Sequence, residues 1–362
     1  MKILLVRLRL IGDVVFTTPA IGGIRRRFPD AHIAYVVEEE AAAVVRDNPN
    51  LDDVIVAVSP RAPHRLRSDI ALIKKLRRER YDVAIDFHGG PRSSLITWAS
   101  GARERIGYQV VGRSWMYTTA VPRTRALRPR HSVESQWDVL VPLGIEPPSP
   151  DRNRPVMVEN AHAAAAVTER LARAGVAGHH SIVVIHVSAG NPFRRWPPAA
   201  FVDLVCRLVV ADPRRRIVLT SGPSDSSAAS SIAEQARTRL AATARDAIVD
   251  CGEFDIAQLR SLMSRASLYI GGDSGPLHVA GTTDVPIVGL YGPTLPVRSR
   301  PYRPASFIDE SVEVQGLPCR PCNQRTCKPG DFRCLTHISA ESVAAAAERA
   351  LQRAVMPAAE GR

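Results

Sequence analysis

The sequence predicts an α/β protein built from two doubly wound domains, each with a parallel sheet. Short apolar runs rich in β-branched residues alternate with helix-periodic segments along the whole chain. At 362 residues, the chain is too long for one ordinary hydrophobic core. Four prolines crowd residues 144–155, which is the composition of a hinge or linker. We therefore place the domain boundary there, with residues 1–155 as the first domain.

The first domain is predicted from leucine and β-branched runs that fit buried parallel strands, and from periodic apolar positions that fit helices. The expected strands are residues 2–6, 32–37, 54–58 and 81–87. The expected helices are residues 14–28, 38–46, 68–78 and 133–143.

The second domain is expected at residues 156–338 and repeats the alternation, with a four-cysteine segment at 319–334. Its expected strands are residues 181–187, 216–220, 247–250, 268–270 and 286–291. Its expected helices are residues 161–174, 198–210, 256–264 and a segment ending at 239. Residues 339–362 are expected to form a C-terminal helix, over 340–355, and a tail.

Composition limits the classes of partner. The net charge is +12, mostly from arginine, which favours polyanionic partners such as nucleic acid, anionic lipid or phosphorylated glycans. The alternative is that the arginine runs are solvated helix faces. Aromatic residues make up only 5%, which argues against a surface that stacks nucleic-acid bases. Arg7 and Arg9 interrupt the apolar N-terminus, so we expect a cytoplasmic protein without a signal peptide.

Four cysteines are clustered near the C-terminus, at Cys319, Cys322, Cys327 and Cys334. In a cytosolic chain such a cluster favours zinc over disulfides. The spacing matches no standard finger or ribbon, so a structural zinc ion is one interpretation and ordinary thiols are the other.

The strongest local signal is residues 270–281, where an apolar strand leads through a glycine-rich polar turn into a helix. Such turns bind phosphate, because glycine lets the backbone approach the anion and the first helical N–H groups point at it. Asp273, Ser274 and Gly275 form the turn, and His278 follows Ser274 by one helical turn. We therefore expect these four residues to bind the diphosphate of a nucleotide-activated sugar. A tight turn with a helix cap is the structural alternative.

Further polar residues follow other predicted strands. Asp13 is a candidate general base, and the alternative is a helix cap. Arg194 and Arg195 precede Trp196 and could neutralise a departing diphosphate, or simply stack on the indole. Asp225 could accept hydrogen bonds from ribose hydroxyls, or cap a helix. No Asp-x-Asp pair stands in a metal-binding setting, so we expect catalysis without a metal.

Three first-domain arginines are weaker candidates for an anionic acceptor. Arg61, Arg65 and Arg92 lie in expected loops or helix starts, where guanidinium groups could grip phosphates. In an arginine-rich chain each of them is also an ordinary surface residue.

Three motifs resemble glycosyltransferase family 9, the ADP-heptose:lipopolysaccharide heptosyltransferases. They are residues 11–14 with 17–20, residues 194–197, and residues 272–278, and they occur in the family's order. The resemblance implies a GT-B fold, with two Rossmann-like domains facing a central cleft. It also implies inverting, metal-independent transfer of heptose, with the acceptor on the first domain and the donor on the second. A different nucleotide-sugar donor or glycan acceptor within the family is one alternative, and a basic zinc-containing nucleic-acid-binding protein is another.

The resemblance also assigns roles to residues. The family's base falls on Asp13 and its donor-phosphate lysine on Arg194, where this chain departs by having arginine. The donor-binding residues expected beside Arg194 are Gly12, Ser188, Arg195, Asp225, Asp273, Ser274, Gly275 and His278. We expect ADP-heptose as donor, a phosphorylated lipid-linked glycan as acceptor, a monomer, peripheral contact with the inner membrane, and no nucleic-acid partner.

Overall fold

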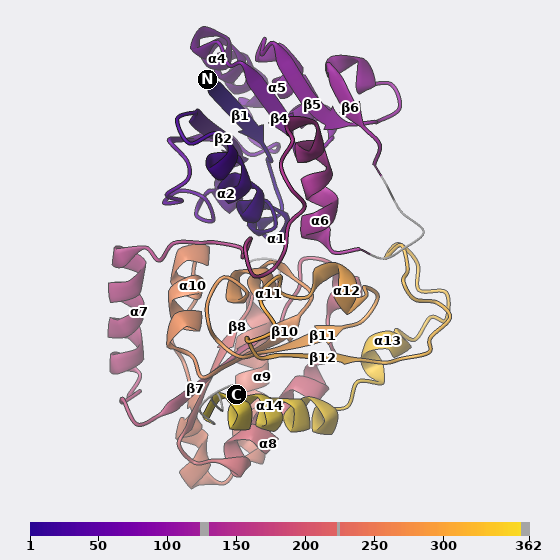
Figure 1. Ribbon diagram of the computed structural model, residues 1–362. Coiled ribbons are helices and arrows are strands. Elements are labelled where there is room, and N and C mark those ends of the chain that lie inside the picture. The colour runs from indigo at the N-terminus through magenta and orange to yellow at the C-terminus, as the bar shows by residue number, and fades with distance from the viewer. Residues whose placement is uncertain (124–129, 223–224, 356–362) are drawn as a thin grey trace, which may run out of the picture. The chain divides into compact units, whose positions relative to one another are not determined.

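The computed structural model describes residues 1–123, 130–222 and 225–355, and the end of the expected C-terminal tail, residues 356–362, lies outside the described part. The chain divides into two compact units (Figure 1). The first comprises Met1–Val158 and Tyr302–Pro304, and the second Glu159–Pro301 and Ala305–Arg362. Within the described ranges, no helix has both the length and the apolar character needed to cross a bilayer.

The first unit contains one fully parallel sheet of six strands in the order β3-β2-β1-β4-β5-β6. The strands are β1 Lys2–Val6, β2 His32–Glu38, β3 Asp53–Ala57, β4 Val83–Asp86, β5 Glu104–Tyr108 and β6 Thr119–Val121. This is the strand order of a doubly wound nucleotide-binding sheet. The central pair is in register from Ile3 with Val83 to Val6 with Asp86, so both strands end at one edge.

The first unit's helices are α1 Ile11–Val15, α2 Thr18–Arg27, α3 Glu39–Ala42, α4 Arg65–Glu79, α5 Pro91–Ala99 and α6 Ser132–Trp137, with 3-10 turns η1 Ser114–Met116 and η2 Asp138–Leu143. The expected single helix over 14–28 is wrong. Pro19 has no N–H to continue the helix, and the Thr17 hydroxyl bonds to the carbonyl of Val14 at 2.7 Å. Similarly, the helix expected over 133–143 turns into a 3-10 segment that contains Pro142.

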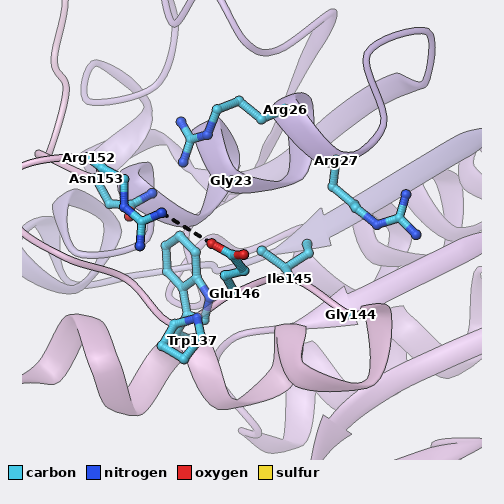
Figure 2. A pocket seen from close by; sticks show the side chains of 10 residues that line it. Gly23, Arg26, Arg27, Trp137, Gly144, Ile145, Glu146, Arg152 and Asn153 are labelled. Carbon is cyan, nitrogen blue, oxygen red and sulfur yellow. Dashed lines mark hydrogen bonds and ion pairs between the residues drawn. The ribbon is translucent and has the colours of Figure 1, made fainter.

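A cavity of about 310 Å³ opens in the first unit beside the C-terminal half of α2 (Figure 2). The chain after η2 forms the other wall of this cavity. It then runs back along α2, where the N–H of Val156 donates to the Thr18 hydroxyl at 2.9 Å.

The second unit has its own parallel sheet in the order β12-β11-β10-β7-β8-β9. The strands are β7 Ser181–His186, β8 Arg215–Thr220, β9 Ile248–Val249, β10 Leu268–Gly272, β11 Ile287–Tyr291 and β12 Asp309–Glu313. Numbered within the unit, this order is the same as in the first sheet. The two halves of the chain therefore repeat one topology, as the alternation of strands and helices predicts.

The helices of the second unit are α7 Ala161–Arg173, α8 Pro198–Ala211, α9 Ser227–Arg239, α10 Ile256–Arg265, α11 Gly275–Ala280, α12 Pro296–Ser299, α13 Arg333–Thr336 and α14 Ala340–Val355, with 3-10 turns η3 Pro192–Arg194 and η5 Ala242–Ala247. The C-terminal helix α14 packs beside α8 (Figure 1). It buries Val343, Ala346, Ala347 and Ala350 in the core of this unit.

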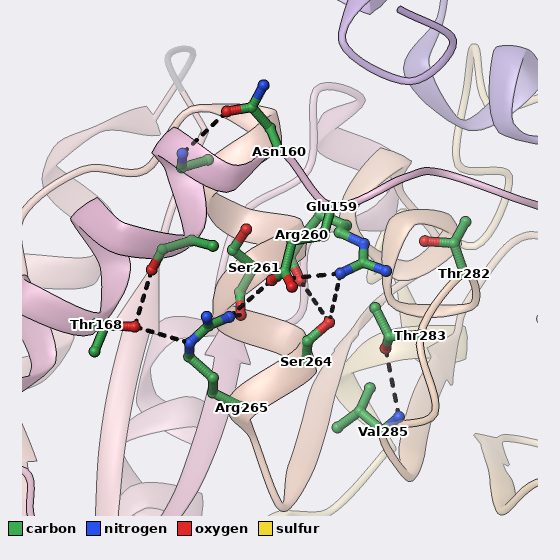
Figure 3. Close-up of polar contacts among 12 residues, drawn as sticks. Glu159, Asn160, Thr168, Arg260, Ser261, Ser264, Arg265, Thr282, Thr283 and Val285 are labelled. Atoms are coloured by element: carbon green, nitrogen blue, oxygen red, sulfur yellow. Dashed lines mark hydrogen bonds and ion pairs between the residues drawn. The ribbon is translucent and has the colours of Figure 1, made fainter. Parts of the chain in front are cut away.

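An ion-pair cluster fastens the first residue of this unit to its helices (Figure 3). Arg265 Nη1 donates to Glu159 Oε1 at 2.8 Å and Arg260 Nη1 lies 3.4 Å from the same oxygen. Arg265 also donates to the Thr168 hydroxyl at 3.2 Å, so the cluster joins α7 to α10. Burial of Glu159 opposes its ionisation, but the two arginines outweigh it and lower the pKa of the carboxyl.

Candidate functional site

The loops that carry the candidate residues follow the central strands of the two sheets. In the first sheet, β1 and β4 are neighbours at the centre, with β2 and β3 on one side of the pair and β5 and β6 on the other. The pair β7 and β10 lies at the centre of the second sheet in the same way. In doubly wound sheets, ligands bind beyond the carboxyl ends of the strands where the strand order reverses in this way. Residues that follow these four strands are therefore the best placed to meet a ligand.

In the first unit, a buried arginine holds the carboxylate of Asp13. Arg7 directly follows β1, is 5% exposed, and forms an ion pair with Asp13 through Nη2. Its Nη1 donates to the carbonyl of Phe87, just after β4, at 2.9 Å. Arg7 thereby ties the ends of both central strands together and orients Asp13, whose side chain remains 32% exposed. Asp13 is the third residue of α1 rather than its cap, and Gly12 is buried beside it.

The loop after β4 brings an imidazole to the same edge. The N–H groups of His88 and Gly89 donate to Asp86 Oδ1 at 2.8 and 3.0 Å, and the Tyr117 hydroxyl donates to Oδ2 at 2.7 Å. These bonds fix the loop around a fully buried carboxylate. Burial, helped by the positive charge of Arg7, lowers the pKa of His88 to about 4. The imidazole is therefore neutral at neutral pH and can either donate or accept a hydrogen bond.

The three candidate acceptor arginines differ in how far they are engaged. Arg92 donates to Glu38 and to Asp69 at 2.6 Å each, and its side chain is only 15% exposed. Arg65 lies 4.0 Å from Asp69 and is 48% exposed, and Arg61 is exposed on the loop before α4. Arg92 therefore cross-links α5 to β2 and α4, whereas the other two side chains point to solvent.

In the second unit, the loop after β7 meets the turn after β10 through Arg194. Its Nη1 donates to the carbonyl of Asp273 at 3.0 Å and lies 3.2 Å from the carboxylate Oδ2 of the same residue. Its Nε donates to Gln324 Oε1 at 2.7 Å. The Thr294 hydroxyl donates to Asp273 Oδ2 at 2.6 Å. Arg194 is thus fixed at the reversal point of the second sheet while 30% of its side chain stays accessible.

Asp273 lies beneath this cluster rather than at its surface, because its side chain is only 2% exposed. His278 Nε2 lies 3.4 Å from Asp273 Oδ1. Burial alone would raise the pKa of Asp273, but His278, Arg194 and Thr294 together lower it to about 2. The carboxylate is therefore ionised and serves to hold the donors around it.

The turn itself differs from the sequence-based expectation. Gly271 and Gly272 belong to β10, so the polar turn begins only at Asp273. A Cβ at Gly271 would clash with the side chain of Tyr269, which explains the glycine by packing. Gly275 begins α11, and the buried hydroxyl of Ser274 makes no hydrogen bond with the described residues.

Two further loops of the second unit are linked by Arg195 and Ser188. Arg195 Nη1 lies 3.2 Å from Asp225 Oδ2, and its Nε donates to the carbonyl of Ala189 at 2.8 Å. Ser188 is buried, and its hydroxyl accepts a bond from the N–H of Gly222 at 2.6 Å. The structure therefore brings the loops after β7 and β8 together, with Asp225 held by an arginine and still 28% exposed.

Several of these residues were not selected from the sequence. His88 could have been, because it follows a predicted strand as Asp13 does. Arg7 carries a weaker signal, a charged residue at the end of a buried strand. Thr294 and Gln324 carry no local signal, because each reaches the cluster only through folding of distant segments.

The four clustered cysteines give no support to a zinc site. All four are free thiols, and they line one cavity of about 290 Å³ together with Phe193 and Phe332. Among the residues that the structure describes, no group of three or more His, Cys, Asp or Glu side chains is arranged to hold a metal ion.

Solved structures resemble the chain along nearly its whole length. The glycosyl transferase family 9 structure from Veillonella parvula has a TM-score of 0.82 at 24% identity and covers 97% of each chain. The structure of Escherichia coli heptosyltransferase WaaC with ADP-2-deoxy-2-fluoro heptose has a TM-score of 0.66 at 20% identity, and covers 96% of this chain and 99% of that one. Two doubly wound parallel sheets with this likeness define the GT-B class of fold.

Sequence comparison then places the chain within that class. The profile described as glycosyltransferase family 9 (heptosyltransferase) matches residues 70–332, well over half of the chain. Lipopolysaccharide heptosyltransferase 3 of Escherichia coli strain K12 is 27% identical over 351 residues, which cover 95% of this chain and 96% of that protein. The chain belongs to glycosyltransferase family 9 and is a glycosyltransferase, which confirms the resemblance inferred from its motifs.

Proposed function

We propose that this enzyme transfers a heptosyl group from ADP-heptose to a lipopolysaccharide inner-core acceptor, with inversion and without a metal. The observation that supports this proposal is that the loops after the central strands carry Asp13 in the first unit and Arg194 in the second. Family membership supports sugar transfer, and the relative bound to an ADP-heptose analogue supports this donor. Family membership also favours this reading over a nucleic-acid-binding protein.

Asp13 is the proposed general base. Its side chain would remove the proton from an acceptor hydroxyl as the oxygen attacks the anomeric carbon of the donor. Attack from the face opposite the leaving diphosphate inverts the configuration at that carbon. Arg7 is a positioning residue, because it holds the carboxylate and is itself anchored to Phe87.

Arg194 is the proposed stabiliser of the departing ADP. When the bond between the anomeric carbon and the diphosphate oxygen breaks, negative charge grows on the leaving group. Arg194 uses Nε and Nη1 for protein contacts, which leaves Nη2 for a phosphate oxygen. The unpaired Ser274 hydroxyl and the N–H of Gly275 would add two donors. Asp273, with His278 beneath the turn, acts indirectly by keeping Arg194 in place.

Asp225 is the proposed ribose ligand, with Arg195 orienting its carboxylate. A neighbouring cavity of about 180 Å³ is lined by Ser221 and Ser226 and by apolar side chains that include Phe254 and Leu259. We propose that it receives the adenine ring, which needs an apolar pocket with a few polar groups. The Ser188 hydroxyl would stay structural, because it already supports Gly222.

The acceptor is proposed to be a phosphorylated lipid-linked glycan at the inner face of the cytoplasmic membrane, met by a monomer in peripheral contact. Arg61 and Arg65 are the candidates for its phosphates, because the side chains of both are exposed. Arg92 would support them indirectly through Asp69.

The decisive experiment is Asp13→Asn assayed beside Asp30→Asn, an exposed aspartate of the same unit. Transfer from ADP-heptose should fall by about 10²–10⁴ in the first variant and stay unchanged in the second. Calorimetric binding of ADP should change by less than about twofold in either. Loss of ADP binding with normal turnover in Asp13→Asn would refute the assignment.

Three further measurements test the finer claims. NMR of the glycosidic product reports the anomeric configuration, and retention would contradict a single displacement. Turnover after exhaustive treatment with EDTA tests metal independence. Mass spectrometry of products from a panel of nucleotide sugars tests the donor, and a better substrate than ADP-heptose would favour a family 9 transferase of different specificity.

A further inference from the structure

Helix α5 of the first unit exposes apolar side chains on its outer face. Pro91, Leu95 and Trp98 recur at helical spacing, and Leu95 is 43% and Trp98 42% exposed. The inner face carries, beside Ile96, three fully buried hydroxyl side chains: Ser93, Ser94 and Thr97. An ordinary surface helix has the opposite arrangement, with its apolar stripe toward the core. Packing of the core therefore does not account for the apolar outer face of α5.

The loop after β5 extends this exposed apolar surface. Trp115 packs edge to face against Trp98, with ring centroids 5.5 Å apart. Trp115 is 62% exposed and Val111 is 98% exposed. The indole N–H of Trp115 donates to the carbonyl of Gly112 at 3.1 Å, which fixes the ring to its own loop. We call the whole set the α5–η1 patch: Pro91, Leu95, Trp98, Val111 and Trp115. Single exposed apolar residues are common, whereas a group of them marks a surface that contacts something.

Helix α4 brings positive charge to the side of this patch. It packs beside α5 (Figure 1). Arg92 of α5 pairs with Asp69 of α4 at 2.6 Å, and Arg77 of α4 lies close to Gly101, just beyond the end of α5. The two helices are therefore neighbours from their first turns to their last. Six exposed basic residues lie on α4: Arg65, Arg67, Lys74, Lys75, Arg77 and Arg78.

The same helix combines this charge with further exposed apolar side chains. Leu66 is 70% exposed and Ile70 is 46% exposed, and their spacing of four residues places them on one face. The acidic residues of α4 are both engaged, Asp69 by Arg92 and Glu79 by Lys2 at 2.9 Å. A basic helix with exposed leucine and isoleucine is typical of proteins that lie on a membrane surface.

The α5–η1 patch begins at the edge of the sheet that carries the candidate base. Helix α5 starts directly after the loop that holds His88, at the same edge as Asp13. The loop after β5 contacts the His88 loop, because Arg113 Nη2 donates to the carbonyl of Gly89 at 3.3 Å. A partner bound at the patch would therefore lie next to the residues that are proposed to meet the acceptor.

We propose that the α5–η1 patch and the basic side of α4 dock on the surface of an anionic lipid bilayer. Tryptophan is favoured at the boundary between lipid and water, and nearby lysine and arginine side chains are attracted to anionic headgroups. A second copy of the chain fits less well, because a two-fold contact through the patch would bring two strongly basic helices together. The inference rests on the proposed function, since a bilayer that holds a lipid-linked acceptor would present it to the edge that carries Asp13.

The test measures sedimentation of the full-length enzyme with phosphatidylcholine vesicles that contain or lack phosphatidylglycerol. Trp98→Ser/Trp115→Ser removes the aromatic rings of the patch, and Lys74→Gln/Lys75→Gln removes charge from α4. The wild type should bind better to vesicles with phosphatidylglycerol. Binding to these vesicles should weaken about tenfold or more in the tryptophan variant and about tenfold in the lysine variant. Circular dichroism melting verifies that each variant is folded.

Two controls match these variants outside the proposed surface. Val210→Ser replaces an apolar residue of α8 that is 75% exposed. Arg26→Gln/Arg27→Gln removes two charges from an exposed pair on α2. Both controls should bind the vesicles as the wild type does. Equal weakening in the arginine control would mean that net charge alone attracts the membrane, and would overturn the proposal.

A measurement on the wild type needs no substitution. Two of the four tryptophans of the chain, Trp137 and Trp196, are each only 3% exposed, so insertion into lipid should affect the fluorescence of Trp98 and Trp115. Vesicles with brominated acyl chains should therefore quench part of the emission. The proposal is overturned if the wild type does not bind anionic vesicles, if it binds without quenching, or if the tryptophan variant binds equally well. A dimer that the tryptophan variant abolishes would mark the patch as a subunit interface and would also overturn it.

Transfer assays with two forms of the acceptor separate this inference from the proposed function. The tryptophan variant should transfer sugar to a deacylated lipopolysaccharide acceptor at the wild-type rate, and should lose about tenfold only when the acceptor is held in vesicles. Equal loss with both acceptors would contradict docking by the patch. If the wild type transfers to neither acceptor, the proposed function fails, and the sedimentation and quenching results still decide whether the patch docks on a membrane.

Discussion

Replacing Asp273 by asparagine tests whether a buried charge organises the donor site. The substitution keeps the shape of the side chain but removes the negative charge that Arg194 and His278 approach at 3.2 and 3.4 Å. The Thr294 hydroxyl can still donate to an amide oxygen in place of the carboxylate oxygen at 2.6 Å. The expected loss therefore comes mainly from the charge interactions.

Its size follows from the pKa of Asp273, which is lowered from 3.8 to about 2. A carboxyl group with a lower pKa in the folded state stabilises the fold when ionised, so the stabilisation is present above pH 3.8 and is lost as the pH falls through about 2. The shift corresponds to about 2–3 kcal/mol at pH 7. For a unit of about 200 residues, this is a decrease in melting temperature of about 5–10 °C.

The assay is urea unfolding of the full-length protein at pH 7, with Asp203→Asn as the matched control. Asp203 is 45% exposed and pairs with Arg207 at 3.0 Å, so its loss should change stability by less than about 0.5 kcal/mol. ADP affinity, measured in parallel, should fall in Asp273→Asn alone, because Arg194 loses its anchor. Equal stability of the two variants at pH 7 would refute the argument that this buried carboxylate is favourably paired.

Three further predictions concern the first unit. His88, with a pKa near 4, should show no NMR titration between pH 8 and 5, and a midpoint near 6.5 would contradict this assignment. The free energy of unfolding that depends on His88 should fall as the pH is lowered from 6.5 toward 4. The reason is that in this range only the unfolded imidazole gains a proton. Arg92→Gln should lower the free energy of unfolding by about 3 kcal/mol in urea titrations, because it leaves the buried carboxylate of Glu38 without its ion-pair partner. The double variant Glu38→Gln/Arg92→Gln should recover part of that loss. Gly107→Ala should lower the free energy of unfolding by about 1–3 kcal/mol, because its methyl group would clash with the ring of Tyr117, whose hydroxyl is hydrogen-bonded to Ser94. An unchanged melting temperature would rule out that clash.

The fold was predictable where the chain repeats its local pattern. The apolar runs of β1, β2 and β7 and the periodic residues of α14 lie close to their expected bounds. Charged or mixed segments were not recognised, as in β12 Asp309–Glu313, which has three acidic residues among five. This strand forms because its backbone pairs with β11, and its sequence has no alternation of apolar residues that would predict a strand.

The candidate site was predictable to the level of loops. Asp13, Arg194 and Asp273 were selected because each follows a strand, and parallel strands end at one edge of a sheet. Their partners were not predictable, since Arg194 meets Gln324 and Arg7 meets Phe87 only after distant segments pack together.

Local chemistry in the chain was therefore enough to indicate two parallel α/β sheets, the strand-end loops and the family. Folding alone revealed that the Asp273 carboxylate is buried against Arg194, and that Arg92 is engaged by two carboxylates. The physical reason is the separation along the chain over which each effect acts. Backbone propensity and apolar period act between neighbours in the sequence, whereas burial, pKa and hydrogen-bond partners depend on atoms that only the folded chain brings within a few ångströms.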